Sequence, residues 1–240
     1  MATWFVDFSA YAVDDVLIDK DWTKAVYTED DISPVIKADA GNPIGSGKVA
    51  EFVIEVARSD NRAFTYDSLV ADNDWEVVYL GKNEDATYHN VGAAARVATR
   101  TYFGVIRNGG VDERIAVANS DGTMTSLAAQ AHGITVTNWF WQRFRVNGNS
   151  LKIKTWQNGD SEPAAWGIEI TDNTLTGSGL AGLFIRPSSI TEKFWWGAVG
   201  FASAGDTAPM EAPATGPATP TNLQGTPSTD SILWTWEAGS

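Results

Sequence analysis

The clearest β-hairpin in the chain runs from Asn138 to Trp156 and reads NWFWQRFRVNGNSLKIKTW. Apolar and polar side chains alternate along both halves of this stretch, which is typical of strands whose two faces meet different surroundings. A turn centred on Gly148-Asn149 would pair Val146 with Leu151. The sequence therefore predicts a hairpin that contributes one apolar face to a β-sheet core.

The second face of this hairpin carries tryptophans and basic side chains, and we expect it to point outward. Indole rings suit the apolar faces of sugar rings, and basic groups suit acidic glycans or carboxylates. The candidate ligand or interface patch consists of Trp139, Trp141, Arg143, Arg145, Lys152, Lys154 and Trp156. Three alternatives are open: a solvated face with basic stems lying over the rings, a protein–protein interface that could take the acidic N-terminal segment of a neighbouring subunit, or a glycan site.

Short strands separated by turn signals account for much of the remaining chain. The segment between residues 9 and 31 is an exception, because it is acidic and mixed, and we expect a surface connection anchored by Trp22. Other strands are expected at Thr3–Phe8, Lys48–Arg58, Trp75–Gly81, Ala94–Arg107, Arg114–Ala118, Thr123–Ala128, Trp166–Thr171, Gly179–Arg186 and Phe194–Phe201. Many short strands without a clear helix predict an all-β sandwich or barrel.

Composition excludes several classes of function. The 240 residues carry 17 Lys and Arg against 30 Asp and Glu, a formal net charge of −13. That balance repels a polyanion such as DNA, so we predict no nucleic-acid partner. The chain has no cysteine, which excludes disulfides, thiolate catalysis and cysteine-ligated zinc. His89 and His132 are its only histidines, too few for most histidine-dependent chemistry.

The two ends of the chain differ in kind. The N-terminus lacks a signal peptide and no apolar run reaches about 18 residues, so we expect synthesis in a cytoplasm and no membrane insertion. Near the C-terminus, Pro and Ala/Thr residues give linker composition. Beyond the linker, Ile232, Trp234 and Trp236 alternate along a strand pattern that we interpret as a partner-docking strand or part of another domain.

Several segments carry a family resemblance. The opening WFVDFSAYAVDD, followed by KDWT, resembles the first strand of concanavalin A-like (laminin-G-like) jelly-roll domains of bacteriophage virion proteins. The later runs FWQRFRVNGNSLKIKTWQNGDSEPAAWGIEIT, GSGLAGLFIR and WWGAVGFASAGDTAP are similar to the back half of that domain. The terminal PTNLQGTPSTDSILWTWEA resembles the first two strands of a fibronectin type III domain.

The resemblance implies a concanavalin A-like jelly-roll β-sandwich over residues 1–208, a Pro/Ala/Thr linker over 209–220 and an incomplete fibronectin type III-like module over 221–240. It implies a non-enzymatic structural protein of a bacteriophage particle: a head decoration, a fibre or a tail appendage. The expected location is the virion, with other virion proteins as partners and a homo-oligomeric state. The alternative is a carbohydrate-binding receptor-binding module, or adhesin, that attaches to a host surface glycan.

A polysaccharide hydrolase is the least favoured reading. Hydrolases of this fold carry carboxylates at alternating positions of one strand, so that acid and nucleophile converge on one face. Glu51 and Glu55 share such a face, but Val53 stands at the middle position where those enzymes have an aspartate. We therefore predict no catalytic residue and no enzymatic activity.

We predict no cofactor and no metal site, with calcium as an open alternative. Lectin-like jelly rolls often hold Ca²⁺ through Asp and Asn oxygens of their loops, which suit a hard cation. The candidate ligands are Asp72, Asn73 and Asp74, or Asp14 and Asp15. A polar loop that satisfies its own hydrogen bonds is the competing reading.

Overall fold

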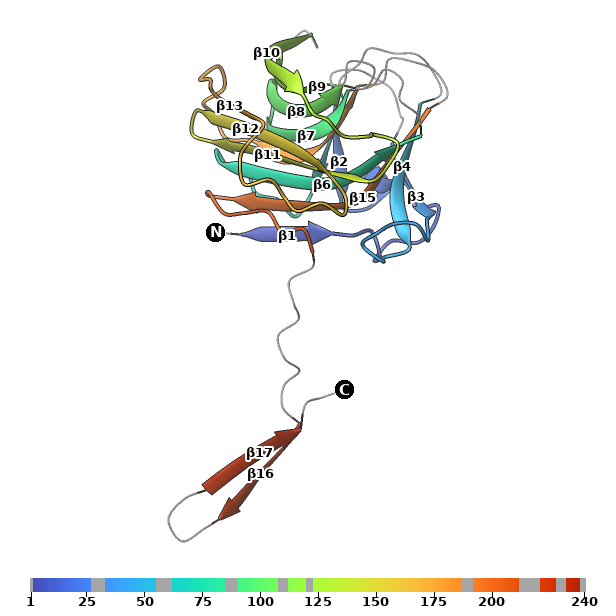
Figure 1. Ribbon diagram of the computed structural model, residues 1–240, viewed down its shortest axis with the longest axis vertical. Helices are drawn as coiled ribbons and strands as arrows, with labels where there is room; N and C mark the ends of the chain where they lie inside the picture. Colours follow the sequence, from blue (N-terminus) through green and yellow to red (C-terminus); the bar gives the residue numbers. More distant parts are fainter. Residues whose placement is uncertain are drawn as a thin grey trace.

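A computed structural model describes residues 2–26, 33–54, 62–84, 90–107, 112–119, 123–186, 192–211, 221–227 and 232–237. Up to residue 211, two antiparallel sheets form the two layers of a β-sandwich (Figure 1). The only helical element in the described ranges is a short 3-10 turn, η1 (Leu17–Asp19). The expected all-β jelly-roll sandwich is confirmed.

The larger sheet, sheet A, has the order β13-β12-β11-β6-β15-β4-β3, with β1 paired to β15 beyond the end of β4. Its strands are β1 (Thr3–Val6), β3 (Val35–Ala38), β4 (Lys48–Ile54), β6 (Trp75–Asn83), β11 (Phe140–Asn147), β12 (Ser150–Gln157), β13 (Ile168–Thr171) and β15 (Glu192–Ser203). The β15 strand is long enough to pair with β4 at its start and with β1 at its end.

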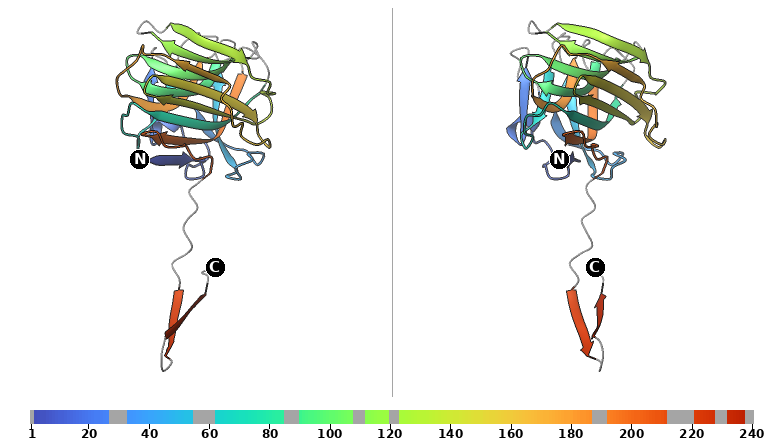
Figure 2. Two further views of the ribbon diagram at one scale, coloured as in Figure 1. Left: turned by 60° about the vertical axis from the view of Figure 1, so that its left-hand side comes forward. Right: turned by 90° about the vertical axis from the view of Figure 1, so that its left-hand side faces the viewer.

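The smaller sheet, sheet B, has the order β10-β9-β8-β7-β14-β5-β2, and Figure 2 shows the two layers from two further sides. Its strands are β2 (Trp22–Val26), β5 (Arg62–Tyr66), β7 (Asn90–Val97), β8 (Thr101–Arg107), β9 (Asp112–Ala118), β10 (Met124–Ala131) and β14 (Leu180–Arg186). Every pairing within both sheets is antiparallel, so alternate residues of each strand face the interior.

Aromatic and aliphatic side chains from both sheets fill the space between them. Phe144, Tyr79 and Trp196 from sheet A and Phe64 from sheet B are fully buried there. This core also holds one carboxylate, Glu113, which accepts hydrogen bonds from a threonine and a glutamine side chain. Burial raises the pKa of Glu113, and those two hydrogen bonds only partly oppose the shift.

The β11–β12 hairpin has the predicted register. Val146 lies opposite Leu151, Trp141 lies opposite Trp156, and the turn falls at residues 148–149. Gly148 adopts a left-handed φ of 57°, a conformation that glycine takes without steric cost and that this tight turn needs. The alternation of side chains and the turn residues together fix this register.

Three strands were not predicted, and one predicted strand is two. Trp22 begins β2 instead of anchoring a loop, and β3 and β5 were also missed. The β2 and β3 strands lie at sheet edges, where one-sided burial weakens the alternation of apolar residues. The predicted strand Ala94–Arg107 is broken at residues 98–100, which contain no glycine or proline to signal a turn.

The chain beyond the sandwich contains β16 (Thr221–Pro227) and β17 (Ile232–Glu237), which form an antiparallel hairpin. Within the described ranges these strands pair only with each other. Ile232, Trp234 and Trp236 all belong to β17, but their side-chain surroundings lie outside the described structure. A fibronectin type III-like module and a partner-docking role for this strand stay predictions.

Candidate functional site

The second face of the β11–β12 hairpin is not open to solvent, contrary to expectation. Trp141 and Trp156 stack with ring centroids 6.4 Å apart and are only 5% and 4% exposed. The connection after β12 covers them, and Asn158 Oδ1 accepts a hydrogen bond of 2.9 Å from the indole of Trp141. Alternation along a strand shows which residues share a face, but it does not show what packs against that face.

A second segment, residues 204–211, covers the same face of sheet A. Ala208 is buried against the sheet and Met210 packs beside it. At Gly200 the backbone comes so close that an added Cβ would lie 1.9 Å from the carbonyl oxygen of Pro209. The chain therefore passes over the outer face of sheet A before it reaches the proline-rich stretch.

Ionic side chains hold both covering segments in place, and we call Glu76, Arg143, Arg145, Lys154 and Glu162 the buried ion cluster. Glu76 accepts hydrogen bonds from both guanidinium groups and, at 3.0 Å, from the backbone N–H of Ala208. Glu162 accepts two hydrogen bonds from Arg143, at 2.8 and 2.9 Å, and pairs with Lys154 at 2.7 Å. Arginine and carboxylate forks of this kind are strong and directional.

The buried ion cluster uses most of the basic charge of the predicted patch. Burial disfavours ionisation of Glu162, but the hydrogen bonds from Arg143 and Lys154 outweigh it, so the pKa of Glu162 lies below its ordinary value. Lys154 also lies over the ring of Trp166, 4.7 Å from its centroid, and Lys152 pairs with Glu169 at 2.6 Å. These residues clamp the covering segments, which leaves little basic charge for a ligand.

The uncovered end of this face presents a different group, which we call the aromatic row: Trp139, Lys82 and Trp195. Trp195 lies opposite Lys82 in the β15–β6 pair, and Trp139 lies beside Lys82 because Phe140 pairs with Gly81. Their neighbours in sequence face the core, so these side chains point outward. All three are half-buried, and the Lys82 ammonium is 5.8 Å and 5.6 Å from the two ring centroids.

Each indole of the aromatic row is held in position. The Trp195 indole donates a hydrogen bond of 2.9 Å to Glu51, and Glu51 also lies 3.5 Å from the ammonium of Lys193. The indole of Trp139 lies against Gly197, where an added Cβ would come within 3.1 Å of its ring. Aromatic groups held rigidly on a strand, as Trp195 is, or directly before one, as Trp139 is, give a surface that needs little ordering when a ligand binds.

The loop between β3 and β4 forms a wall beside the aromatic row. The Asn42 amide donates hydrogen bonds to the carbonyl oxygens of Lys48 and Gly197, at 2.7 and 3.0 Å. Ile44 from this loop packs against the same apolar cluster as Trp139. The turn residues of this segment therefore shape one side of the row.

The loop proposed for calcium is organised around a guanidinium instead. Arg96, 3% exposed, donates hydrogen bonds to the carbonyl oxygens of Asn73, Gly148 and Leu175, and lies 4.0 Å from Asp74. It is the extra residue of a β-bulge in β7 and adopts a left-handed φ of 55°, which is uncommon for arginine. A fixed positive charge at this position does not suit a second cation.

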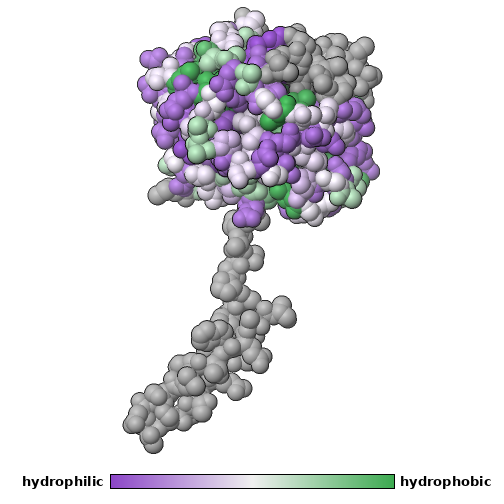
Figure 3. All heavy atoms as spheres, viewed as in Figure 1, coloured by the Kyte–Doolittle hydropathy of each residue, from purple (hydrophilic) through white to green (hydrophobic). Residues whose placement is uncertain are grey.

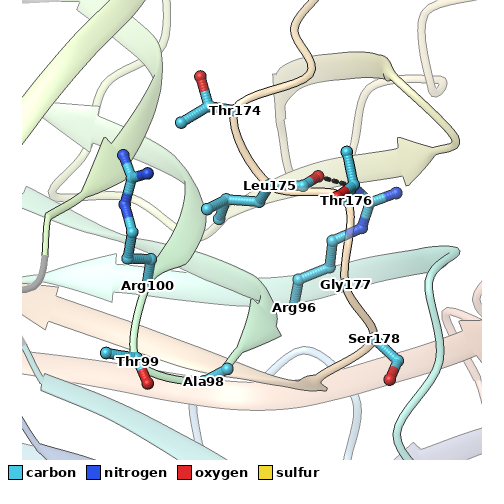
Figure 4. A pocket seen from close by; sticks show the side chains of 9 residues that line it. All are labelled: Arg96, Ala98, Thr99, Arg100, Thr174, Leu175, Thr176, Gly177 and Ser178. Carbon is cyan, nitrogen blue, oxygen red and sulfur yellow. Dashed lines mark hydrogen bonds between the residues drawn. The ribbon is translucent and has the colours of Figure 1, made fainter.

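A shallow cleft of about 280 Å³ lies beside Arg96, between the β7–β8 turn and the β13–β14 loop (Figure 4). Its polar lining is mainly hydroxyl groups together with Arg100, whose guanidinium donates to Asn119 Oδ1 at 3.1 Å. Asp172, next to this cleft, binds the hydroxyl of Tyr102. The charges here already have partners, so the cleft offers a ligand less than the aromatic row does.

The remaining candidates do not form a centre. Asp14 pairs with Lys37 at 2.6 Å, and Asp15 pairs with Lys20 at 3.1 Å. His132 accepts a hydrogen bond from a nearby backbone N–H, and Glu55 lies outside the described residues. Across the ranges that the structure covers, no three His, Cys, Asp or Glu side chains gather as metal ligands.

Lys82 and Trp195 are not among the residues of the predicted patch, because they belong to β6 and β15, which lie outside the hairpin in sequence. The outward positions of β6 do include Lys82, and Trp195 lies in a Trp-Trp pair whose second member is buried. Only the strand order β11-β6-β15 brings them beside Trp139. The acidic partners of the clamp, Glu76 and Glu162, were missed for the same reason.

No protein-family model matches the chain. No curated protein sequence matches it either. Among solved structures, the carbohydrate-binding module CBM66 from Bacillus subtilis shares 12% identity over 73% of this chain and 91% of that one, with a TM-score of 0.51. A native glycosidic hydrolase shares 10% identity over 85% of this chain and 97% of that one, with a TM-score of 0.53.

At these identities the likeness establishes the fold alone. The chain has the jelly-roll β-sandwich architecture of those neighbours. A bacteriophage origin and a fibronectin type III relationship find no support in the comparisons, and both stay predictions. In the part of the chain that the structure describes, no helix has the length and apolar character of a membrane span.

Proposed function

We propose that this protein is a non-catalytic carbohydrate-binding module and that the aromatic row is its glycan site. The observation that carries the proposal is the pair of half-buried indoles, Trp139 and Trp195, on either side of Lys82 at the uncovered end of sheet A. Indole faces stack on the apolar faces of sugar rings, and the ammonium supplies hydrogen bonds to sugar oxygens. A carbohydrate-binding module among the structural neighbours is compatible with this use of the fold.

Carboxylate chemistry at this face supports binding over hydrolysis. Glu51 is 8% exposed as a residue, and one of its oxygens accepts the Trp195 indole hydrogen while facing Lys193. A glycosidase needs two carboxyl groups about 5–10 Å apart, one of them free to donate a proton to the leaving group. Glu51 instead positions a tryptophan, which is a binding role.

The test is a double substitution, Trp139→Ala with Trp195→Ala. The wild-type protein is screened against immobilised neutral and acidic polysaccharides, and glycans that bind are titrated by calorimetry. We expect the double variant to lose at least about fivefold in affinity, since stacking of rings on aromatic groups contributes about 0.5–1.5 kcal/mol per pair and two pairs are removed. The matched control is Trp166→Ala, which removes a tryptophan outside the row, from the connection between β12 and β13 that covers the same face of sheet A.

Two results would count against the proposal. One is a wild-type protein that binds no glycan of the panel. The other is a double variant that binds as tightly as the wild type while the Trp166→Ala protein weakens. Reducing-sugar release from any bound glycan that disappears in Glu51→Gln would favour the hydrolase reading instead.

A structural role on a bacteriophage particle is the second candidate. The observation that favours it is the clamp on residues 204–211, in which Glu76 and Arg143 bind the backbone of Ala208 just before the proline-rich stretch. Because the chain leaves the sandwich at a fixed position, the sandwich could be held at a defined place on a particle surface. Immunogold electron microscopy of purified particles tests this role. Particles that carry no gold label, with the protein found only in the soluble fraction, would contradict it.

A further inference from the structure

The aromatic row contains a positive charge, that of Lys82, whose surroundings differ from those of the ion-paired charges on this face. Around it, Glu51 pairs with Lys193, Glu76 with Arg143 and Arg145, Glu162 with Lys154, and Glu169 with Lys152. For Lys82, by contrast, no carboxylate among the described residues lies within ion-pair distance, and its recorded neighbours are the two indole rings. Glu84, just beyond the end of β6, is exposed and forms no ion pair with Lys82 in the described part of the chain.

Acidic residues outnumber basic ones by 30 to 17, and yet no carboxylate of the described residues pairs with this ammonium. Cation–π contacts with the rings partly replace water around the ammonium, but they do not satisfy its three N–H donors. A carboxylate placed between the indoles would supply both a counter-charge and hydrogen-bond acceptors.

We infer that the aromatic row selects sugars that carry a carboxylate, such as uronic acids or sialic acids, with Lys82 as the residue that recognises the acid. This inference rests on the proposed function. The indoles of Trp139 and Trp195 contact the sugar rings, and the ammonium between them contacts the carboxylate. The negative charge of Glu51 is offset by the ammonium of Lys193, and its carboxylate already accepts the Trp195 indole hydrogen.

The experiment compares matched glycans that differ only in charge. Polygalacturonate, alginate and sialyllactose are each titrated beside their carboxyl-reduced neutral forms, against the wild type and three variants. Lys82→Met removes the charge but keeps the apolar stem, and Lys82→Arg keeps the charge. Lys152→Met is the control, because it removes a lysine of the same sheet face that already has a partner, Glu169. Thermal denaturation verifies that each variant is folded.

We expect at least one acidic glycan to bind about tenfold or more tightly than its reduced form, since hydrogen bonds between charged groups are about twice as strong as neutral ones. Lys82→Met should abolish this preference, while Lys82→Arg and Lys152→Met should retain it. Equal binding of acidic and neutral forms, or a preference that survives Lys82→Met, would overturn the inference and leave glycan binding intact. Absence of binding to every glycan, acidic and neutral, would overturn both proposals.

Discussion

Glu76 is the residue on which the clamp over sheet A depends most. It is 1% exposed, and its carboxylate binds Arg143, Arg145 and the backbone N–H of Ala208. Glu76→Gln keeps the volume but sets an amide NH₂ against guanidinium donors and removes their counter-charge. Loss of one partner from a buried ion pair costs about 3–5 kcal/mol. Arg143 retains Glu162 and Arg145 can turn towards solvent, so we expect about 3 kcal/mol.

Urea denaturation followed by tryptophan fluorescence measures this loss, and each kcal/mol corresponds to about 2–4 °C in Tm for a domain of this size. Hydrogen exchange should also quicken in residues 204–211, because the Ala208 N–H loses its acceptor. The control is Lys37→Gln, which breaks the exposed pair with Asp14 and should leave Tm unchanged. A loss below about 1 kcal/mol for Glu76→Gln would refute the reasoning, since desolvation would then cancel the attraction.

Three further outcomes are expected. Because burial raises the pKa of Glu113, the folded state holds the proton of this carboxyl group more tightly than the unfolded state does. The free energy of unfolding should therefore fall as pH rises through the range just above the ordinary carboxyl pKa. In urea denaturation at a series of pH values, Glu113→Gln should remove this decrease. Gly200→Ala would drive a Cβ against the Pro209 carbonyl, so denaturation should show a loss of about 1–3 kcal/mol and exchange in residues 204–211 should quicken. Gly197→Ala would place a Cβ 2.9 Å from both Asn42 Oδ1 and Leu80 Cδ2 and 3.1 Å from the Trp139 ring, so both Tm and glycan affinity should drop. Unchanged affinity would contradict the assigned position of that indole.

Strands of the sandwich could be predicted from the sequence where the alternation of apolar residues and the turn residues match the contacts that the strands make in the fold. The β11–β12 register follows from alternation and from the turn at Gly148, and both are properties of adjacent residues. The break between β7 and β8 could not be predicted in this way. It follows a β-bulge at Arg96, which has a left-handed backbone and whose guanidinium donates hydrogen bonds to three carbonyl oxygens from distant loops.

The candidate site was only partly predictable for a related reason. Trp139 belongs to the predicted patch, but its partners Lys82 and Trp195 come from strands far away in sequence. Trp141 and Arg143 share its face and yet are buried, because residues 158–167 and 204–211 lie over them. Periodicity assigns side chains to faces of a strand; the order of strands and the path of covering segments decide which of them meet a ligand.

The pairing of β1 with β15 has a consequence for how this protein is made. Thr3 lies opposite Ala202, so the first strand of the body pairs with its last strand. During synthesis β1 leaves the ribosome long before its partner exists, and closing a loop of that length delays the contact further. We therefore expect sheet A to close only after β15 has emerged, and the edge of β1 is exposed to premature pairing until then.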